Sequence, residues 1–198
     1  MRVISGQYRS RALIAPRGCD TRPTSDRLRE TLFNVLAPRI EGTAFLDLYA
    51  GSGAVGIEAI SRGAAHAVFV EHAPPALAAL RANLDRLCIR ENIRIQAGSV
   101  STFLRRIHQG APLIFDLIFL DPPWNSAEEY AATLALLGGA SSSPLAPDAQ
   151  VIAEHRRKQP LQDAYGNLRR TRLLEQGDAA LSFFAERSQA PNSETSSL

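Results

Sequence analysis

The sequence predicts an α/β fold in which a mostly parallel, doubly wound sheet carries helices on both faces. Short apolar runs alternate with helix-like stretches through most of the chain, and the first run in this alternation leads through a glycine-rich turn into an Ala-rich helix. At 198 residues with 45% hydrophobic content, the chain has the size of one domain with small additions. In such a sheet, ligands bind where the strands end.

Residues 1–40 predict a basic N-terminal extension made of a short hairpin and a helix. The hairpin would pair residues 3–4 with residues 12–14 through Gly6. The segment Pro23-Thr24-Ser25 then supplies a helix cap. The apolar face of the helix that follows is formed by Leu28, Leu32, Val35 and Leu36.

Residues 41–186 predict the main domain, in which strands and helices alternate. The expected strands are 44–49, 66–71, 93–97, 115–120 and 150–154, and the expected helices are 54–62, 74–87, 100–108 and 127–137. The apolar runs 172–174 and 180–185 flank Gln176-Gly177-Asp178, which predicts an antiparallel hairpin at the sheet edge. Residues 138–147 predict a loop of small residues, and residues 187–198 predict a disordered tail.

The composition argues against membrane and metal proteins. No apolar run approaches the roughly 20 residues that span a bilayer, and the first residues show no signal-peptide pattern, so we expect a cytoplasmic protein. Cys19 and Cys88 are too far apart for a disulfide framework or a zinc motif. The four histidines show no ligand spacing, so we expect no metal.

Positive charge gathers at the N-terminal end of the chain. Residues 1–40 contain eight arginines against three acidic residues, whereas the whole chain has a formal charge of only +2. Such a segment is typical of a nucleic-acid contact, although a solvated basic face would have the same composition. The candidate nucleic-acid-binding residues are Arg2, Arg9, Arg11, Arg22, Thr24, Arg27 and Arg29.

The glycine-rich turn indicates a nucleotide-like ligand. Gly51, Gly53 and Gly56 match G-x-G-x-x-G, and Glu71 ends the following strand, where a carboxylate can bind ribose hydroxyls. Taken literally, this is a dinucleotide fingerprint. Asp47, however, stands four residues before the first glycine, where it would repel a pyrophosphate and attract an ammonium group. S-adenosylmethionine has an ammonium group and a ribose but no phosphate, so it fits this turn better than NAD.

The tetrapeptide Asp121-Pro122-Pro123-Trp124 predicts a site for methylating an exocyclic amine. The Asp121 carboxylate and the Pro122 carbonyl can accept hydrogen bonds from one NH2 group, while Trp124 stacks on the base that carries it. The prolines stiffen the backbone and lack N–H donors that would compete for the acceptors. A strand-end turn with a buried Trp is the structural alternative, and the glycine-rich turn earlier in the chain favours the catalytic interpretation.

These motifs resemble those of the ribosomal small-subunit methyltransferase D family, whose members methylate guanine N2 in 16S rRNA. The most specific match is the segment from Arg22 to Asn34, Arg-Pro-Thr-Ser-Asp-Arg-Leu-Arg-Glu-Thr-Leu-Phe-Asn, and the stretches 47–53 and 121–123 also match. The resemblance extends from Arg2 through Glu154. It implies a Rossmann-like class I fold that uses S-adenosylmethionine and methylation of the guanine(966)-N2 type.

The resemblance also implies roles for individual residues. The 22–29 segment would lie over the cofactor and the RNA, and the 121–124 tetrapeptide would hold the base. Gly98-Ser99 takes the place where many relatives carry Asp or Asn against the adenine. The expected partner is 16S rRNA or an assembling small ribosomal subunit, and a monomer is expected. The expected cofactor contacts are Asp47, Tyr49, Gly51, Ser52, Gly53, Glu71 and Ser99.

Three alternatives remain open at this point. An amino-methyltransferase acting on DNA or on a protein glutamine would use a similar tetrapeptide, although those enzymes more often carry Asn-Pro-Pro-Tyr. A nicotinamide-dinucleotide enzyme would use the glycine-rich turn, and cofactor titration would identify it. A non-catalytic RNA-binding module would retain the fold, but the intact 121–124 tetrapeptide favours an enzyme.

Overall fold

The computed structural model describes residues 1–16, 25–109, 113–123, 126–139 and 144–186. Within these residues, an eight-stranded sheet has the order β3-β2-β1-β4-β5-β8-β7-β6. Its parallel part consists of β1 (Ala44–Leu48), β2 (His66–Glu71), β3 (Ile93–Ala97), β4 (Phe115–Leu120) and β5 (Leu145–Arg156). Its antiparallel part consists of β6 (Ala164–Tyr165), β7 (Leu168–Gln176) and β8 (Ala179–Glu186).

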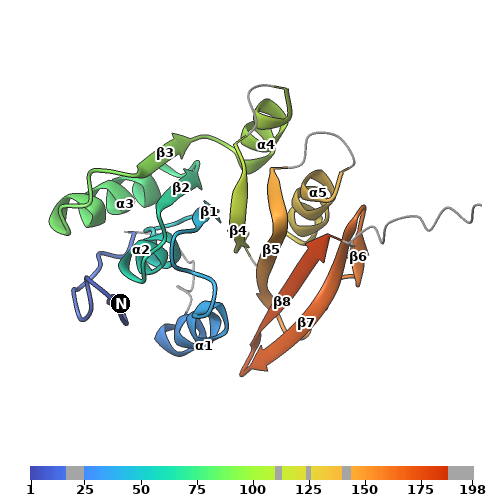
Figure 1. Cartoon of the computed structure of the whole chain (residues 1–198), viewed down its shortest axis with the longest axis horizontal. Coiled ribbons are helices and arrows are strands. Elements are labelled where there is room, and N and C mark those ends of the chain that lie inside the picture. The colour runs from blue at the N-terminus through green and yellow to red at the C-terminus, as the bar shows by residue number, and fades with distance from the viewer. Residues whose placement is uncertain (17–24, 110–112, 124–125, 140–143, 187–198) are drawn as a thin grey trace, which may run out of the picture.

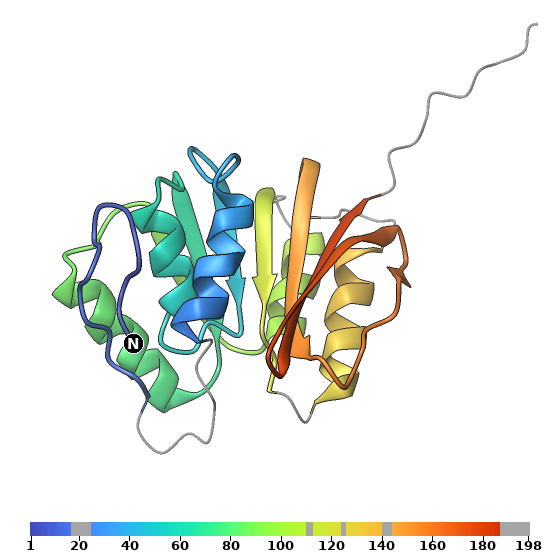
Figure 2. The same ribbon diagram turned by 90° about the horizontal axis from the view of Figure 1, so that it is seen from below.

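Helices cover both faces of the sheet, as the doubly wound prediction requires (Figures 1 and 2). One face packs against α1 (Asp26–Leu36), α2 (Ala54–Ser61) and α3 (Pro74–Arg86), and their apolar side chains share one buried cluster with Phe45, Phe69 and Phe119. The other face packs against α4 (Val100–Gln109) and α5 (Ala127–Leu137). Because both faces are covered, every residue of β1 is buried, and all of them except Asp47 are apolar.

The strand order reverses at β1, because β2 lies on one side of it and β4 on the other. At such a switch point the loops that follow neighbouring strands diverge, and ligands bind in the crevice between them. The carboxyl ends of β1, β2, β4 and β5 all meet at this edge of the sheet, which we call the carboxyl edge.

The sequence placed most elements correctly, but β5 differs. The sequence predicts a loop over 138–147, whereas β5 begins at Leu145. The reason is an irregularity in the pairing of β4 with β5: Phe115 pairs with Leu145, whereas Leu117 pairs with Gln150. The intervening residues bulge out, with Asp148 at φ 63°, so their Ala-Pro-Asp-Ala composition gives no strand pattern.

The predicted C-terminal hairpin is confirmed as β7 and β8, which are joined through Gly177, and β7 is longer than predicted. The two-residue β6 was not predicted from the sequence.

The N-terminal hairpin forms only one antiparallel bridge, Arg2 with Ala12, supported by a 2.9 Å hydrogen bond from Val3 N to Arg11 O. Val3 and Leu13 are buried in the cluster beneath α1, α2 and α3. The predicted cap of α1 is confirmed, since the Ser25 hydroxyl accepts a hydrogen bond from Leu28 N. The division of the chain at residue 40 stays a prediction, as does the tail, which lies outside the described residues.

Candidate active site

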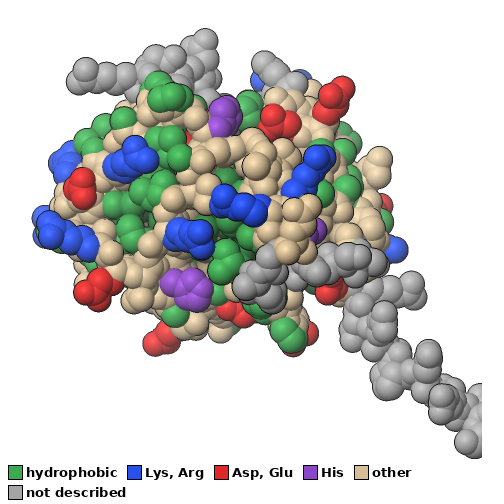
Figure 3. All heavy atoms as spheres, turned by 90° about the horizontal axis from the view of Figure 1, so that it is seen from above, with side chains coloured by type: hydrophobic (Ala, Val, Ile, Leu, Met, Phe, Trp, Pro, Cys, Tyr) green, Lys and Arg blue, Asp and Glu red, His purple; other side chains and the backbone are tan. Residues whose placement is uncertain are grey.

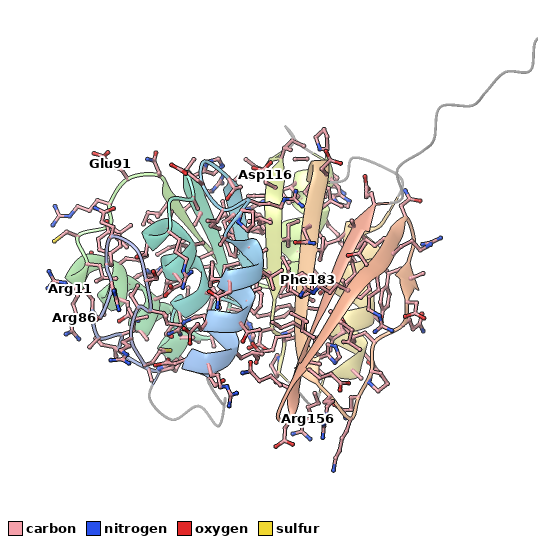
Figure 4. All side chains as sticks on the ribbon, turned by 60° about the horizontal axis from the view of Figure 1, so that its bottom comes forward. Arg11, Arg86, Glu91, Asp116, Arg156 and Phe183 are labelled. Carbon is pink, nitrogen blue, oxygen red and sulfur yellow. The ribbon has the colours of Figure 1, made fainter. Side chains whose placement is uncertain are left out.

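The carboxyl edge brings the two predicted motifs together. β1 ends directly before the glycine-rich turn, and Asp121 follows the neighbouring strand β4, with Leu48 paired to Leu120 in register. The backbone N–H of Asp121 donates to Leu48 O at 3.4 Å, so the pairing continues to the tetrapeptide. Figure 4 shows Arg156, which ends β5, at the opposite end of the sheet from Asp116, which lies near the start of β4.

Gly51 and Gly53, which precede α2, are glycines for different structural reasons. Gly53 has φ +80°, and a Cβ there would lie 2.4 Å from Leu80 Cδ1, so packing requires glycine. Gly51 has φ +57°, and a Cβ there would meet no atom within 4 Å. The chain therefore passes Gly51 with open space beside its backbone, as a ligand-binding turn needs.

Asp47 is almost completely buried and supports the glycine-rich turn. Its Oδ2 accepts a 2.8 Å hydrogen bond from Gly56 N, and the residue is 2% exposed. Burial raises the pKa of the Asp47 carboxyl to about 7, and the nearby charge of Glu71 adds to this shift. A Cβ on Gly56 would lie 3.0 Å from Asp47 Oδ2 and 2.3 Å from Phe69 Cε1. The third glycine of the motif thus makes room for a carboxylate and a ring.

Glu71 ties the end of β2 to the glycine-rich turn. Its Oε2 accepts from Gly51 N at 2.8 Å, and its Oε1 accepts from His72 N and Ala73 N at 2.7 Å. A carboxylate has about four acceptor positions, so three are filled by backbone N–H groups. The structure places Glu71 at the end of β2 beside Gly51; its contact with ribose hydroxyls, which would share or replace these bonds, stays a prediction.

The hydroxyls of three other predicted cofactor residues contact neighbouring protein groups. Ser52 is buried, and its Oγ lies 4.0 Å from Met1 Sδ. Ser99 accepts from Thr102 N at the start of α4. The Tyr49 hydroxyl lies 2.8 Å from Thr133 Oγ1 on α5. Tyr49 also has φ 63°, a left-handed conformation that costs free energy in a non-glycine residue and is common at functional sites.

The carboxyl edge fits the nucleoside and amino-acid parts of S-adenosylmethionine. Besides the open side of Gly51, a Cβ on Gly98 would meet no atom within 4 Å, and Glu71 ends the strand between β1 and β3. The N–H groups of Gly51 and Gly56 are occupied by carboxylates. The two carboxylates, Glu71 and Asp47, bring negative charge to the turn, so it favours a cationic, hydroxyl-bearing ligand over a phosphate.

The acceptor motif lies at the ends of β4 and β5. Asp121 is half-buried, Pro122 is buried, Pro123 is exposed, and Trp124 lies outside the described residues. The Tyr130 hydroxyl on α5 lies 3.2 Å from Pro122 O and 2.9 Å from Glu154 O. Burial raises the pKa of this hydroxyl above its ordinary value, with Asp121 and Glu154 adding to the shift. Tyr130 therefore stays neutral and donates to one of the two carbonyls at a time.

Sequence reasoning did not identify Tyr130 or Glu154 as site residues. Nothing in the helical stretch 127–137 marks Tyr130, because its role depends on a contact with another strand end. Glu154 could have been identified from the sequence, since it is an acidic residue at the end of the apolar run 150–154. A carboxylate that ends a buried parallel strand points to the ligand-binding edge.

The structure supports surface exposure for four of the predicted RNA-binding residues. Arg2, Arg9, Arg11 and Arg27 are exposed, whereas Arg22 and Thr24 lie outside the described residues. Figure 4 shows Arg11 on the α3 side of the molecule, away from Arg156 at the carboxyl edge. On the face that carries α4, Lys and Arg side chains lie apart from one another and form no single patch (Figure 3).

The prediction that Arg29 contacts RNA is wrong, because its side chain is fully buried. Its Nη2 donates to Arg2 O and to Asp26 Oδ1, while Nε and Nη1 are buried without a partner. Burial lowers the pKa of Arg29, and the charges of Asp26 and Glu58 oppose this shift. Glu58 in turn accepts from Ile4 N at 2.7 Å. Arg29 thus links residue 2 of the N-terminal hairpin to α1, and phosphates do not reach its buried side chain.

Two kinds of feature are absent from the described residues. No helix there combines the length and the apolar content of a membrane span. No group of three or more His, Cys, Asp or Glu side chains there is placed to hold a metal ion.

Comparison with known proteins places the chain in a family. The sequence profile of the family described as "Conserved hypothetical protein 95" matches residues 1–185. The "Putative rRNA methyltransferase YlbH" of Bacillus subtilis is 35% identical over 94% of this chain and 100% of its own length. The "Ribosomal RNA small subunit methyltransferase D" of Haemophilus influenzae is 37% identical over 81% of each chain.

The protein of the same name from Escherichia coli is 43% identical over 63% of this chain and 60% of its own length. Among solved structures, the Escherichia coli protein titled "Putative methyltransferase yhhF" superimposes with a TM-score of 0.79 at 34% identity, covering 96% of this chain and 99% of that one. The chain therefore belongs to the Conserved hypothetical protein 95 family, the family of the ribosomal RNA small subunit methyltransferases D.

Proposed function

We propose that the protein transfers a methyl group from S-adenosylmethionine to the N2 amine of a guanine in 16S rRNA, at the position equivalent to guanine 966. The observation that carries the proposal is that Asp121 and Pro122 directly follow the strand beside the one that leads into the glycine-rich turn. A hydrogen-bond acceptor pair and a nucleotide-type cradle at adjacent strand ends suit transfer between two bound molecules. Membership of a methyltransferase family supports the same reaction.

The cofactor would be held by Asp47, Gly51 and Glu71. When bound, S-adenosylmethionine supplies an electrophilic methyl group on a sulfonium. The ionised Asp47 carboxylate attracts the ammonium group, and the Glu71 carboxylate accepts from the ribose hydroxyls. The open side of Gly51 leaves room for the ligand against the backbone. The same buried carboxylate at Asp47 disfavours NAD, because a pyrophosphate would be placed near a negative charge.

Asp121 and Pro122 prepare the amine. The lone pair of guanine N2 is delocalised into the ring, so the amine is a poor nucleophile until its N–H groups are held by acceptors. The Asp121 carboxylate and the Pro122 carbonyl take these two hydrogen bonds, orient the lone pair and stabilise the positive charge that grows on N2. Once the N–C bond has formed, the surplus proton passes from N2 to Asp121.

Tyr130 fixes one of these acceptors. Its hydroxyl lies 3.2 Å from Pro122 O, and its ring is buried at the start of α5. A carbonyl oxygen has two lone pairs, so Pro122 O can take the amine N–H while it keeps the tyrosine. The contact thereby positions the Pro122 carbonyl and leaves one lone pair for the amine.

Exposed arginines would bind the RNA. Arg2, Arg9, Arg11 and Arg27 lie at the surface, and arginine contacts to phosphates give affinity that does not depend on sequence. The substrate in this proposal is 16S rRNA or an assembling small ribosomal subunit. The protein acts as a monomer in the cytoplasm, where that substrate is found.

Mapping of methylated nucleotides tests the proposal. Ribosomal RNA from cells with and without this protein should differ at one N2-methylguanine, and the purified protein should restore it in the presence of S-adenosylmethionine. Free 16S rRNA and assembled small subunits, tested side by side, would identify the natural substrate. A methyl group on adenine, on cytosine or on a protein glutamine, or binding of NAD in place of S-adenosylmethionine, would overturn the proposal.

A further inference from the structure

We propose that Glu154 reads the base, by accepting a hydrogen bond from guanine N1–H next to the amine that Asp121 and Pro122 hold. The inference rests on the proposed function and extends it to base selection. Glu154 is 3% exposed at the end of β5, and the methyl-transfer chemistry above makes no use of it. A buried carboxylate at the ligand-binding edge of the sheet is placed to accept a hydrogen bond from a bound group.

The register of the sheet places Glu154 beside Asp121. Phe119 of β4 pairs with Ile152 of β5, and both side chains lie in the cluster beneath α1, α2 and α3. Side chains alternate between the two faces of a strand, so the residues two positions further on, Asp121 and Glu154, share that face. Leu181, which pairs with Glu154 from β8, lies in the same cluster. Neighbouring strands lie about 4.8 Å apart, so the two carboxylates are adjacent at the edge.

Tyr130 joins the two strand ends from the other face. Its hydroxyl reaches both Pro122 O at 3.2 Å and Glu154 O at 2.9 Å. Burial raises the pKa of this hydroxyl, and the charges of Asp121 and Glu154 add to the shift. One side chain thus lies within hydrogen-bond distance of the backbone at both strand ends and donates to one carbonyl at a time.

The chemistry of the base edge then favours guanine. In guanine one of the two ring nitrogens that flank the amine, N1, carries a hydrogen, whereas the single ring nitrogen next to the amine of adenine or cytosine is an acceptor. A carboxylate at that point accepts from guanine and repels the lone pair of adenine or cytosine. A carboxylate has about four acceptor positions, so the base contact is compatible with the interactions that Glu154 already makes.

The test compares two substrates in wild-type protein and in Glu154→Gln. One RNA carries the mapped guanine, and the other carries 2-aminopurine there, which keeps the N2 amine but has an unprotonated N1. In single-turnover methylation, wild type should prefer guanine. Glu154→Gln should lower this preference by about 10- to 100-fold, because its amide can donate to N1 of 2-aminopurine and the loss of a buried charged acceptor affects only guanine. The loss of O6 in 2-aminopurine is common to both proteins and cancels in the ratio.

Controls separate this inference from the function and from folding. Glu175→Gln, an exposed position on β7, should leave the preference unchanged. Cofactor affinity and thermal unfolding report whether Glu154→Gln is folded, and Glu154→Asp, which keeps a carboxylate, should retain the guanine preference at a lower rate. If wild type methylates guanine and folded Glu154→Gln keeps the wild-type preference, or if Glu154→Asp loses the preference, the inference is wrong. If wild type methylates no guanine in rRNA, the proposed function itself fails.

Discussion

The two halves of the carboxyl edge are held by opposite kinds of hydrogen bond. In the cofactor half, at the ends of β1 and β2, side-chain carboxylates accept from backbone N–H groups: Asp47 from Gly56, and Glu71 from Gly51 and the residues that follow it. In the acceptor half, at the ends of β4 and β5, the Tyr130 hydroxyl donates to backbone carbonyls.

The difference shows what each half offers to a ligand. In the cofactor half, carboxylates accept from four backbone N–H groups, and under the proposed function this half presents negative charge to a ligand with an ammonium group and hydroxyls. Under the same proposal, the acceptor half presents carbonyl and carboxylate oxygens to an amine. Among the described residues, the N–H groups of Gly51 and Gly56 already donate to carboxylates, although the glycine pattern alone suggests a phosphate site. The comparison also predicts that substitutions in the two halves have separable effects.

The largest effect is expected from Asp121→Ala. It removes an acceptor whose interaction strengthens as N2 becomes positive, so the single-turnover rate should fall by about 10² or more. Affinity for S-adenosylmethionine should change little, because Asp121 belongs to the acceptor half. Asp178→Ala, in the exposed β7–β8 turn, is the matched control and should keep the wild-type rate. A wild-type rate for Asp121→Ala would make Asp121 a structural strand-end residue.

The next effect is on stability, in the cofactor half. Gly53→Ala forces a Cβ to within 2.4 Å of Leu80 Cδ1 at φ +80°, so it should lower the free energy of unfolding by about 2–3 kcal/mol. Gly177→Ala has a similar φ of +61° with nothing within 4 Å, so it isolates the backbone cost of about 1 kcal/mol. Chemical denaturation measures both. Equal losses would show that packing against α3 contributes nothing.

The pH dependence of cofactor binding tests Asp47. Burial raises its pKa from 3.8 to about 7, and the ammonium group of the cofactor binds the ionised form. Affinity should therefore fall as the pH drops below 7, by up to about tenfold per unit. The folded protein binds this proton more tightly than the unfolded chain, so Asp47 should lower the free energy of unfolding as the pH rises from about 4 to 7.

Calorimetry at about pH 6, 7 and 8, on both sides of the raised pKa, measures the cofactor affinity. Thermal unfolding over the lower pH range measures the stability. Asp47→Asn should bind the cofactor more weakly and show neither trend. If wild type and Asp47→Asn show the same pH dependence, another group is responsible.

The smallest effect is expected at the RNA surface. Arg27→Ala removes one exposed cation from α1, so rRNA affinity should fall a few-fold and the salt dependence should lose roughly one phosphate contact. Arg29→Ala, two residues further on, should instead lower the free energy of unfolding, since it removes the contacts to Arg2 and Asp26. Salt titrations of RNA binding and denaturation curves separate the pair. A loss of salt dependence in a folded Arg29→Ala would contradict the buried assignment.

The sequence predicted the parallel sheet well because its central strands are largely apolar on both faces, and the edge strand β3 alternates apolar with polar residues. The bounds of β2, β3, β4 and α5 agree with the expected ranges. β5 was predicted too short because its first part is a bulged segment with Pro147 and Asp148, which shows no strand pattern.

Arg29 shows how a charged residue misleads a prediction from composition. It lies four residues before Phe33 and one after Leu28, which places it on the buried stripe of α1. The helical periodicity therefore indicated that Arg29 is buried, but the number of arginines in residues 1–40 favoured an RNA contact. Tyr130 and Glu154 could not be found in the same way, because their roles arise from the register between β4 and β5 and from a contact with α5.

Cofactor affinity across both halves tests the central claim most directly. Calorimetric titration of S-adenosylmethionine into wild type, Glu71→Gln, Asp121→Asn and Tyr130→Phe uses near-isosteric changes at the two ends of the same edge. Glu71→Gln should weaken binding by about tenfold or more, because it removes a charged acceptor for the ribose hydroxyls. Asp121→Asn and Tyr130→Phe should bind with wild-type affinity. Equal weakening by Glu71→Gln and Asp121→Asn would show that the two halves form one site and would contradict the division between cofactor and base.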